Sequence, residues 1–222
     1  MNRRKFLKRG IGLTGLTVLV TSIPLVSKLT DNRMKRILMI TGSPRKNGNS
    51  EALAESFING AIESGHQVTR FDSAFKEVKP CVGCNNCFSK ENMACIFKDD
   101  FNELVTHIMQ SDMIVFVTPL YWFTYTAKMK AAIDKFYSFL IGNKLETKNK
   151  ETILLSVCGD ENIAEFDTLV KQYKMMVSAN QWTDIGQLLV PGVLAKGDIS
   201  NKPEYLTKAE ELGKTLDINS II

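Results

Sequence analysis

The sequence predicts an α/β fold in which helices cover both faces of a doubly wound, five-stranded parallel sheet. Short apolar runs of strand length alternate along the chain with longer segments whose apolar residues recur at helical spacing. Most of these runs are nearly continuous, as expected of strands that are buried on both faces. Right-handed crossovers between such strands leave few topologies, and the flavodoxin-like strand order 2-1-3-4-5 is the natural one.

The first half of this pattern opens with an apolar strand, Lys35–Thr41. A helix follows over Ser50–Ser64, with an apolar stripe on one face and Gly65 at its end. The second strand, Gln67–Asp72, is weaker, and a cysteine-rich insert over residues 80–98 comes after it.

The second half repeats the alternation of helix and strand without any insert. Each helix is predicted from an apolar stripe and each strand from a continuous apolar run. In order, these elements are helix Asp99–Gln110, strand Met113–Thr118, helix Ala127–Leu140, strand Thr152–Val157, helix Glu161–Ser178, strand Ile185–Val190 and helix Lys202–Leu216.

The 222 residues suit one such domain, over residues 34–222, preceded by a basic appendage over residues 1–33. The appendage holds seven Lys or Arg and one acid, so the formal net charge of +4 becomes about −2 for the remainder. A slightly acidic domain has no general affinity for nucleic acid, and we expect none.

The appendage has the plan of an export signal, with a charged start and an uncharged, moderately apolar run over residues 10–27. Arg3-Arg4-Lys5-Phe6-Leu7-Lys8 resembles the twin-arginine (Tat) signal of bacterial export. This resemblance implies the Tat machinery as a partner, export in the folded state and a periplasmic or membrane-anchored extracytoplasmic location. Two alternatives are a basic membrane-surface segment and a start at Met34, which would leave the protein in the cytoplasm. Cleavage and retention as a membrane anchor both stay open.

The loop between the first strand and its helix has the character of an anion site. Helix N-termini offer unpaired N–H groups and the positive end of the helix dipole. Arg45 adds charge there, and the loop lacks the Gly-Lys-Ser/Thr ending of nucleotide-triphosphate loops, so a phosphate monoester fits better than ATP. The alternative is an ordinary strand-to-helix turn with Ser50 as N-cap. The candidate donors in the loop are Ser43, Asn47, Asn49 and Ser50.

Two further loops should reach the same edge, because the carboxyl ends of parallel strands lie together. The loop after the third strand is aromatic and suits a flat heteroaromatic ring, although its rings could instead pack on helices or form a subunit interface. The loop after the fourth strand brings Cys158 and Gly159, and Cys158 is either reactive or a small buried hydrophobe. The ring-binding candidates are Pro119, Leu120, Tyr121, Trp122, Phe123 and Thr124.

These loops together resemble the NAD(P)H-dependent FMN reductases and the related iron-sulfur flavoproteins, which are flavodoxin-like. The resemblance rests on residues 42–50, on Thr118 to Trp122 and on the start of the helix at Ala127. It implies that the first loop holds the FMN phosphate and that Pro119 to Thr124 line the isoalloxazine ring. Many relatives have glycine where this chain has Phe123.

Four cysteines, with the spacing Cys81-x2-Cys84-x2-Cys87-x7-Cys95, are gathered in the insert. Compact four-thiolate spacing suits a cubane iron–sulfur cluster or a structural zinc, and an exported protein could also pair them in disulfides. The iron-sulfur flavoproteins carry a similar motif, which favours a [4Fe–4S] cluster over zinc.

We therefore expect an FMN-dependent oxidoreductase with electrons entering from NAD(P)H or another donor. The electrons would pass through FMN, with or without a [4Fe–4S] cluster as a further carrier, to a small acceptor such as a quinone or a flavin. The alternative is a carrier that serves a protein redox partner without turnover of small molecules. The exposed aromatics also predict a homo-oligomer. The flavin performs the hydride and electron chemistry, and the sequence does not identify a catalytic side chain.

Overall fold

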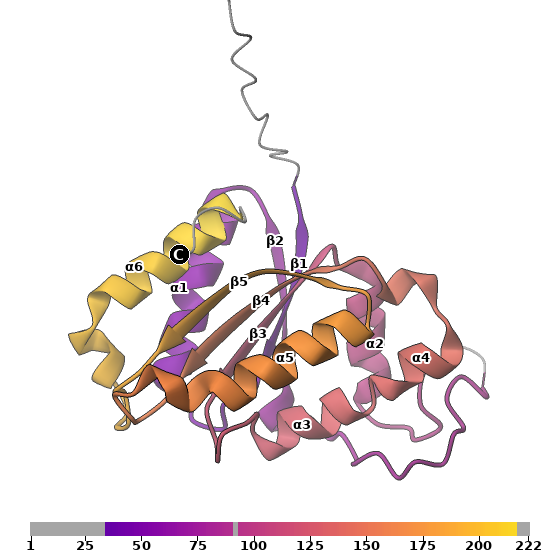
Figure 1. Ribbon diagram of the computed structural model, residues 1–222. Helices are drawn as coiled ribbons and strands as arrows, with labels where there is room; N and C mark the ends of the chain where they lie inside the picture. The colour runs from indigo at the N-terminus through magenta and orange to yellow at the C-terminus, as the bar shows by residue number, and fades with distance from the viewer. Residues whose placement is uncertain (1–33, 91–92, 217–222) are drawn as a thin grey trace, which may run out of the picture. The chain divides into compact units, whose positions relative to one another are not determined.

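The computed structural model describes residues 34–90 and 93–216, and these form a single five-stranded parallel sheet with helices on both faces (Figure 1). The strand order is β2-β1-β3-β4-β5, which confirms the predicted fold. The strands are β1 (Arg36–Thr41), β2 (Gln67–Asp72), β3 (Met113–Pro119), β4 (Glu151–Val157) and β5 (Thr183–Val190). The helices are α1 (Asn49–Glu63), α2 (Phe101–Gln110), α3 (Ala127–Asp134), α4 (Tyr137–Gly142), α5 (Asp167–Ala179) and α6 (Pro203–Thr215).

The twin-arginine prediction falls on residues 1–33, which lie outside the described part of the chain. Within residues 34–90 and 93–216, no helix is long and apolar enough to cross a membrane.

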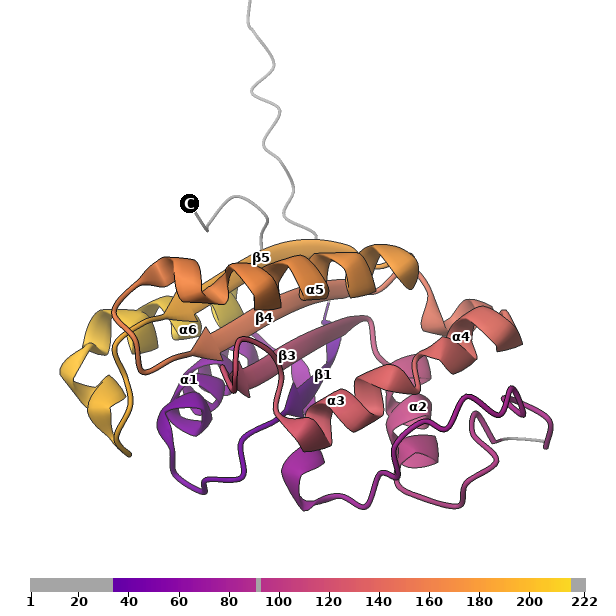
Figure 2. The ribbon, with the colours of Figure 1, turned by 60° about the horizontal axis from the view of Figure 1, so that its bottom comes forward.

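Two separate apolar layers flank the sheet, because successive strand residues point to opposite faces. Ile37 and Met39 of β1 pack in the layer formed with α1 and α6. Leu38 and Ile40 pack in the other layer, with residues of α2, α3 and α5. Figure 2 shows α3 and α5 on the near side of the sheet, and α1 and α6 behind it. Burial on both faces explains why the strands are continuous apolar runs.

The strand register brings four loops to one edge of the sheet. Thr41 at the end of β1 lies beside Val117, and Pro119 at the end of β3 lies beside Val157. Val157 in turn pairs with Val190, the last residue of β5. The segments that follow β1, β3, β4 and β5 therefore leave the sheet side by side, and the candidate site lies among them.

Two predicted helices differ. The helix expected over Glu161–Ser178 begins with a 3-10 turn, Ile163–Phe166, and α5 starts only at Asp167. The helix expected over Ala127–Leu140 is broken into α3 and α4. The backbone tightens at the break, where Lys135 N–H donates to Ala132 C=O and Phe136 N–H donates to Ile133 C=O. The ammonium of Lys135 meets the carboxylate of Asp99 at 2.5 Å, and both side chains are only 2% exposed. The break thus coincides with a buried ion pair, which helical periodicity does not reveal.

Candidate functional site

The first loop of the site runs from Gly42 to Gly48 and delivers the chain into α1. Gly48 is the N-cap of α1 and makes no side-chain cap, which differs from the Ser50 cap considered as an alternative. Ser50 lies inside the helix and is buried. The first N–H groups of the helix, with the positive end of its dipole, consequently face the loop without a capping side chain.

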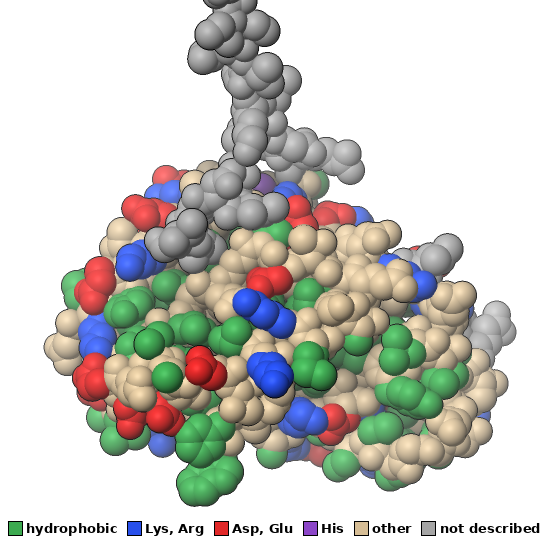
Figure 3. Space-filling model, in the orientation of Figure 1, with side chains coloured by type: hydrophobic (Ala, Val, Ile, Leu, Met, Phe, Trp, Pro, Cys, Tyr) green, Lys and Arg blue, Asp and Glu red, His purple; other side chains and the backbone are tan. Residues whose placement is uncertain are grey.

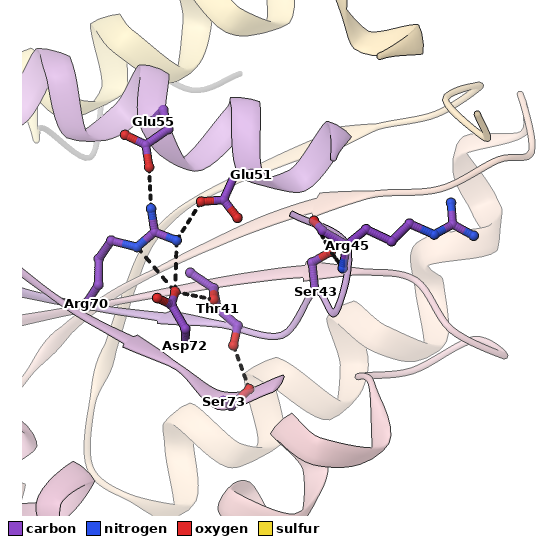
Figure 4. A network of polar contacts seen from close by, with 8 residues as sticks. All are labelled: Thr41, Ser43, Arg45, Glu51, Glu55, Arg70, Asp72 and Ser73. Carbon is purple, nitrogen blue, oxygen red and sulfur yellow. Dashed lines mark hydrogen bonds and ion pairs between the residues drawn. The ribbon is translucent and has the colours of Figure 1, made fainter. Parts of the chain in front are cut away.

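Hydrogen bonds at Ser43 and Gly42 fix the shape of this loop and join it to the loop after β3. Ser43 Oγ accepts a hydrogen bond from Arg45 N–H at 3.1 Å (Figure 4). Thr126 Oγ1 donates to Gly42 C=O at 2.7 Å. A Cβ at Gly42 would lie only 2.9 Å from this Thr126 hydroxyl oxygen. Glycine is therefore needed for this close approach, which brings the loop after β3 against the loop after β1.

A polar network behind the loop fixes the end of β1 to β2 and α1. The Arg70 guanidinium pairs with Glu51, Glu55 and Asp72 (Figure 4). Burial lowers the pKa of Arg70, but the hydrogen bonds and charges of Asp72 and Glu51 outweigh it and hold that pKa above its usual range. Thr41 Oγ1 donates to Asp72 Oδ1 at 2.7 Å. In the same figure the Arg45 side chain extends away from this network, and it donates instead to Leu194 C=O at 3.3 Å. Arg45 is thus free of carboxylate partners in the network and available to an anion.

One hollow of about 470 Å³ joins three predicted loops. Ser43 and Arg45 line it from the first loop, Leu120 and Tyr121 from the second, and Cys158 from the third. Of the residues predicted from the sequence, those that line the hollow are Ser43, Arg45, Asn49, Ser50, Pro119, Leu120, Tyr121, Cys158 and Gly159.

Four predicted residues do not line this hollow: Asn47, Trp122, Phe123 and Thr124. Trp122 and Phe123 form the tip of a tight hairpin closed by Tyr121 and Thr124, and both tip residues have positive φ, at 48° and 64°. Trp122 is 91% exposed. Figure 3 shows a hydrophobic group protruding at the lower edge, where Figure 1 has the loop between β3 and α3. Thr124 contacts α5 instead, where its Oγ1 donates a hydrogen bond to Gln172 Oε1 at 2.6 Å.

A fourth wall of the hollow comes from a segment that the sequence did not indicate, the loop after β5. Val193 and Leu194 line the hollow, and Asn49 ties their loop to α1. Asn49 Nδ2 donates to Ala195 C=O at 2.8 Å, while its Oδ1 accepts from Gly197 N–H at 3.0 Å and Ile199 N–H at 3.3 Å. The Asn49 amide therefore positions the fourth wall. Position alone could have indicated this loop, since it follows a parallel strand.

Cys158 and Gly159 form the side of the hollow after β4. Burial raises the pKa of the Cys158 thiol, and its Sγ donates to Asp160 C=O at 3.2 Å. The buried, hydrogen-bonded thiol matches the reading of Cys158 as a small hydrophobe more closely than a reactive one. A Cβ at Gly159 would lie 2.8 Å from Leu194 Cδ1, so glycine leaves room for the Leu194 side chain, which is exposed at the rim of the hollow.

The four clustered cysteines line a second hollow, of about 370 Å³, between the insert and the start of α4. Burial and repulsion from Cys95, Cys81 and Cys84 raise the pKa of Cys87. A hydrogen bond from the backbone of Asn86 lowers the pKa of Cys84. All five cysteines are free thiols, so the disulfide alternative has no support in the described residues.

No group of three or more His, Cys, Asp or Glu in residues 34–90 and 93–216 is arranged to hold a metal ion. A single zinc would require its four sulfurs at about 2.3 Å. The thiolates of a cubane surround a body of eight iron and sulfur atoms instead. The four cysteines that line the hollow are the donor type that both groups use, and the described residues form no closed metal site.

Comparison with known proteins places this architecture in a family. The family described as NADPH-dependent FMN reductase matches residues 35–189. An iron-sulfur flavoprotein of Methanosarcina thermophila is 31% identical over 158 residues, which are 71% of this chain and 77% of the relative. An iron-sulfur flavoprotein of Methanocaldococcus jannaschii is 33% identical over 113 residues, 51% of this chain and 58% of the relative's length.

Among solved structures, an NAD(P)H:quinone oxidoreductase from Methanothermobacter marburgensis superposes with a TM-score of 0.67 at 18% identity. The match covers 83% of this chain and 96% of that one, and it shows that the fold is shared. The family match covers most of the sheet and three of the four walls of the hollow. The chain therefore belongs to the NADPH-dependent FMN reductase family, and it is an FMN reductase-like oxidoreductase.

Proposed function

We propose that the hollow at the carboxyl edge of the sheet holds FMN. We further propose that the chain passes electrons from NAD(P)H or another donor through this flavin to a small acceptor such as a quinone or a free flavin. One observation carries the proposal: a single hollow joins an uncapped helix N-terminus, flanked by Ser43 and Arg45, to a wall that contains Leu120 and Tyr121. A ligand with a phosphate at one end and a flat ring at the other fits such a hollow.

The residues of this chain bind and orient the flavin, which supplies the hydride and electron chemistry when bound. Ser43, Arg45 and the first N–H groups of α1 would hold the phosphate. Leu120, Tyr121 and Leu194 would enclose the ring, and Gly159 leaves room for the Leu194 side chain. The name of the solved NAD(P)H:quinone oxidoreductase supports the proposed donor and acceptor classes.

The four thiolates of Cys81, Cys84, Cys87 and Cys95 would hold a [4Fe–4S] cluster that exchanges single electrons. Two observations support this part: the sulfurs share one hollow, and two relatives are named iron-sulfur flavoproteins. Zinc is less favoured because the described cysteines do not close around one point.

An anaerobic preparation tests both parts. We expect a flavin absorbance band, about one FMN per chain, and iron and sulfide with little zinc. NAD(P)H oxidation with a quinone should be steady. A colourless preparation that also fails to take up added FMN would overturn the flavin proposal. Iron-free protein that retains FMN would overturn the cluster alone.

A carrier function is the second candidate, and the exposed hairpin favours it, because a 91% exposed Trp122 offers an apolar contact to a protein partner. Steady NAD(P)H oxidation with quinone or flavin supports the enzyme. Reduction that occurs only through a protein partner supports the carrier.

The exposed hairpin also supports the proposed homo-oligomer. Sedimentation of wild type and of Trp122→Ser tests it, and we expect the variant to lose association.

We also propose that the chain is exported folded by the twin-arginine route, on the evidence of Arg3 and Arg4 in the sequence. Fractionation of wild type and an Arg3→Lys/Arg4→Lys variant tests this. Wild type should be extracytoplasmic and the variant should be retained in the cytoplasm, whereas the same cytoplasmic location for both would contradict export.

A further inference from the structure

The inner wall of the cysteine hollow carries two polar side chains that come from the break between α3 and α4. Lys135 and Ser138 are three residues apart, and both line the hollow with the four cysteines. The remaining wall includes the apolar side chains of Val82, Ile96 and Phe97. Asn85, Asn86 and Tyr137 also line the hollow but are exposed, whereas Lys135 and Ser138 are deeply buried.

Ser138 is unusual because its hydroxyl has no hydrogen-bond partner. The residue is 1% exposed, and its Oγ is one of two buried side-chain N or O atoms in the described residues without a partner; the other is Tyr125 Oη. A buried hydroxyl without a partner destabilises the fold, because it loses its hydrogen bonds to water and gains none in return. A donor that is unsatisfied on the wall of a hollow indicates that an acceptor belongs in that hollow.

Lys135 places the positive end of an ion pair beside the same hollow. Lys135 is part of the lining, whereas its partner Asp99 is not. The Lys135 ammonium lies 5.3 Å from the ring centroid of Phe97, which also lines the hollow. Asp99 is further neutralised by N–H groups, since Oδ2 accepts from Lys79 N–H at 2.9 Å and Oδ1 accepts from Phe101 N–H at 3.2 Å. The Asp99 carboxylate is thus balanced outside the lining of the hollow, and the Lys135 cation is held beside a wall residue, Phe97.

We propose that Ser138 and Lys135 tune the cluster, with the Ser138 O–H donating a hydrogen bond to a cysteine sulfur while the Lys135 ammonium lies nearby. This inference rests on the proposed cluster. Reduction adds one electron, supplied by the reduced flavin, and adds no proton and breaks no bond. The added negative charge is stabilised by a donor and a cation held in an apolar wall, so the two residues raise the reduction potential.

The test compares the full-length wild type with Ser138→Ala, both prepared anaerobically with cluster and FMN. We expect equal iron and sulfide per chain and a cluster midpoint potential that shifts to more negative values in Ser138→Ala. Ser138→Thr, which keeps the hydroxyl, should return the potential toward the wild-type value. Tyr125→Phe removes the other unpartnered hydroxyl, which does not line the hollow, and should leave the potential unchanged.

A second measurement separates tuning from a purely structural role. The hydroxyl has no partner in the protein, so Ser138→Ala should not lower the denaturation midpoint of the chelator-treated, iron-free chain. A lower midpoint, or an unchanged potential in an iron-loaded variant, would overturn the inference and leave the cluster proposal standing. Wild type without iron and sulfide would overturn the cluster proposal itself.

Discussion

At the scale of single residues, the phosphate end of the hollow depends on Ser43 and Arg45. Ser43 shapes the turn through its bond to Arg45 N–H, and Arg45 supplies a cation that no described carboxylate neutralises in a salt bridge. Both lie where α1 begins without a side-chain cap. The affinity for the phosphate should therefore be concentrated in these two side chains and the helix terminus.

Replacing both residues in a Ser43→Ala/Arg45→Ala variant should weaken FMN binding about 10- to 100-fold, because a hydrogen bond to a charged group contributes about 1.5 to 3 kcal/mol. Flavin fluorescence titration measures the affinity. Riboflavin, which lacks the phosphate, should bind the two proteins alike. Lys46→Ala is the matched control, since it removes a cation of the same loop that does not line the hollow. Equal FMN affinity in the double variant and wild type would count against the assignment.

His66 makes stability depend on pH. Burial and the charge of Lys35 lower the pKa of His66, and its Nδ1 accepts a hydrogen bond from Lys35 N–H at 3.1 Å. The folded state thus favours the neutral ring. The stabilisation is fully present above the pKa of His66 in the unfolded chain, about 6.5, and it is lost as the pH falls through the lower pKa of His66 in the folded protein. Urea midpoints should fall between pH 7.5 and 5, and a His66→Gln variant should show a shallower fall.

At the scale of elements, the hairpin between β3 and α3 is built against the preferences of its sequence. Two-residue hairpin turns with positive φ at both positions prefer Asn-Gly, yet Trp122 and Phe123 occupy them here. Bulky residues in this region are strained. Such strain is typical of sites where geometry serves binding, and here it presents two large, exposed rings at the tip of the hairpin.

Relieving that strain should stabilise the protein. Phe123→Gly is expected to be more stable than Phe123→Ala by about 1 kcal/mol, because only glycine adopts the left-handed conformation without penalty. Both variants lose the ring, so the comparison isolates the backbone. Thermal denaturation measures the difference, and an alanine variant as stable as the glycine variant would argue against strain.

The junction of α3 and α4 depends on its buried ion pair. Lys135→Met leaves the Asp99 carboxylate without its cation, and breaking a buried pair costs about 3 to 5 kcal/mol. Adding Asp99→Asn should recover part of this loss, since the neutral amide needs no cation and its single oxygen still accepts one of the two backbone hydrogen bonds. Denaturant unfolding of both variants gives the values, and a double variant less stable than Lys135→Met would refute the explanation.

At the scale of the whole molecule, the flavin hollow joins four loops that are far apart in the sequence. Its walls come from the segments after β1, β3, β4 and β5, and Asn49 links the first to the last. Filling the hollow should therefore stabilise the fold as a unit. We expect the four segments to be protected from proteolysis together.

Free FMN at about one hundred times its dissociation constant should raise the free energy of unfolding by about 2.7 kcal/mol. Chemical denaturation with and without FMN measures this change. Riboflavin at the same concentration should stabilise less, because it leaves the start of α1 without an anion. Equal stabilisation by the two flavins would place the ligand elsewhere.

Much of the site was predictable because each of its loops can be recognised from its own short stretch of sequence. Ser43 and Tyr121 each lie in a loop that follows an apolar strand, and parallel strands bring such loops together by rule. Leu194 was missed because nothing in its local sequence marks it as a ligand contact. Trp122 was assigned to the ring surface by its type, yet the hairpin turns it into solvent.

The sequence by itself determined the order of the strands, the edge at which the loops meet and the four thiols that share one segment. These follow from hydrophobic periodicity and spacing, which are properties of neighbouring residues. Only the tertiary structure decided that Asn49 holds the loop after β5, and that Lys135 and Ser138 lie against the cysteines. Such contacts join segments distant in sequence, and they depend on packing and on where buried polar groups find partners, which no local pattern encodes.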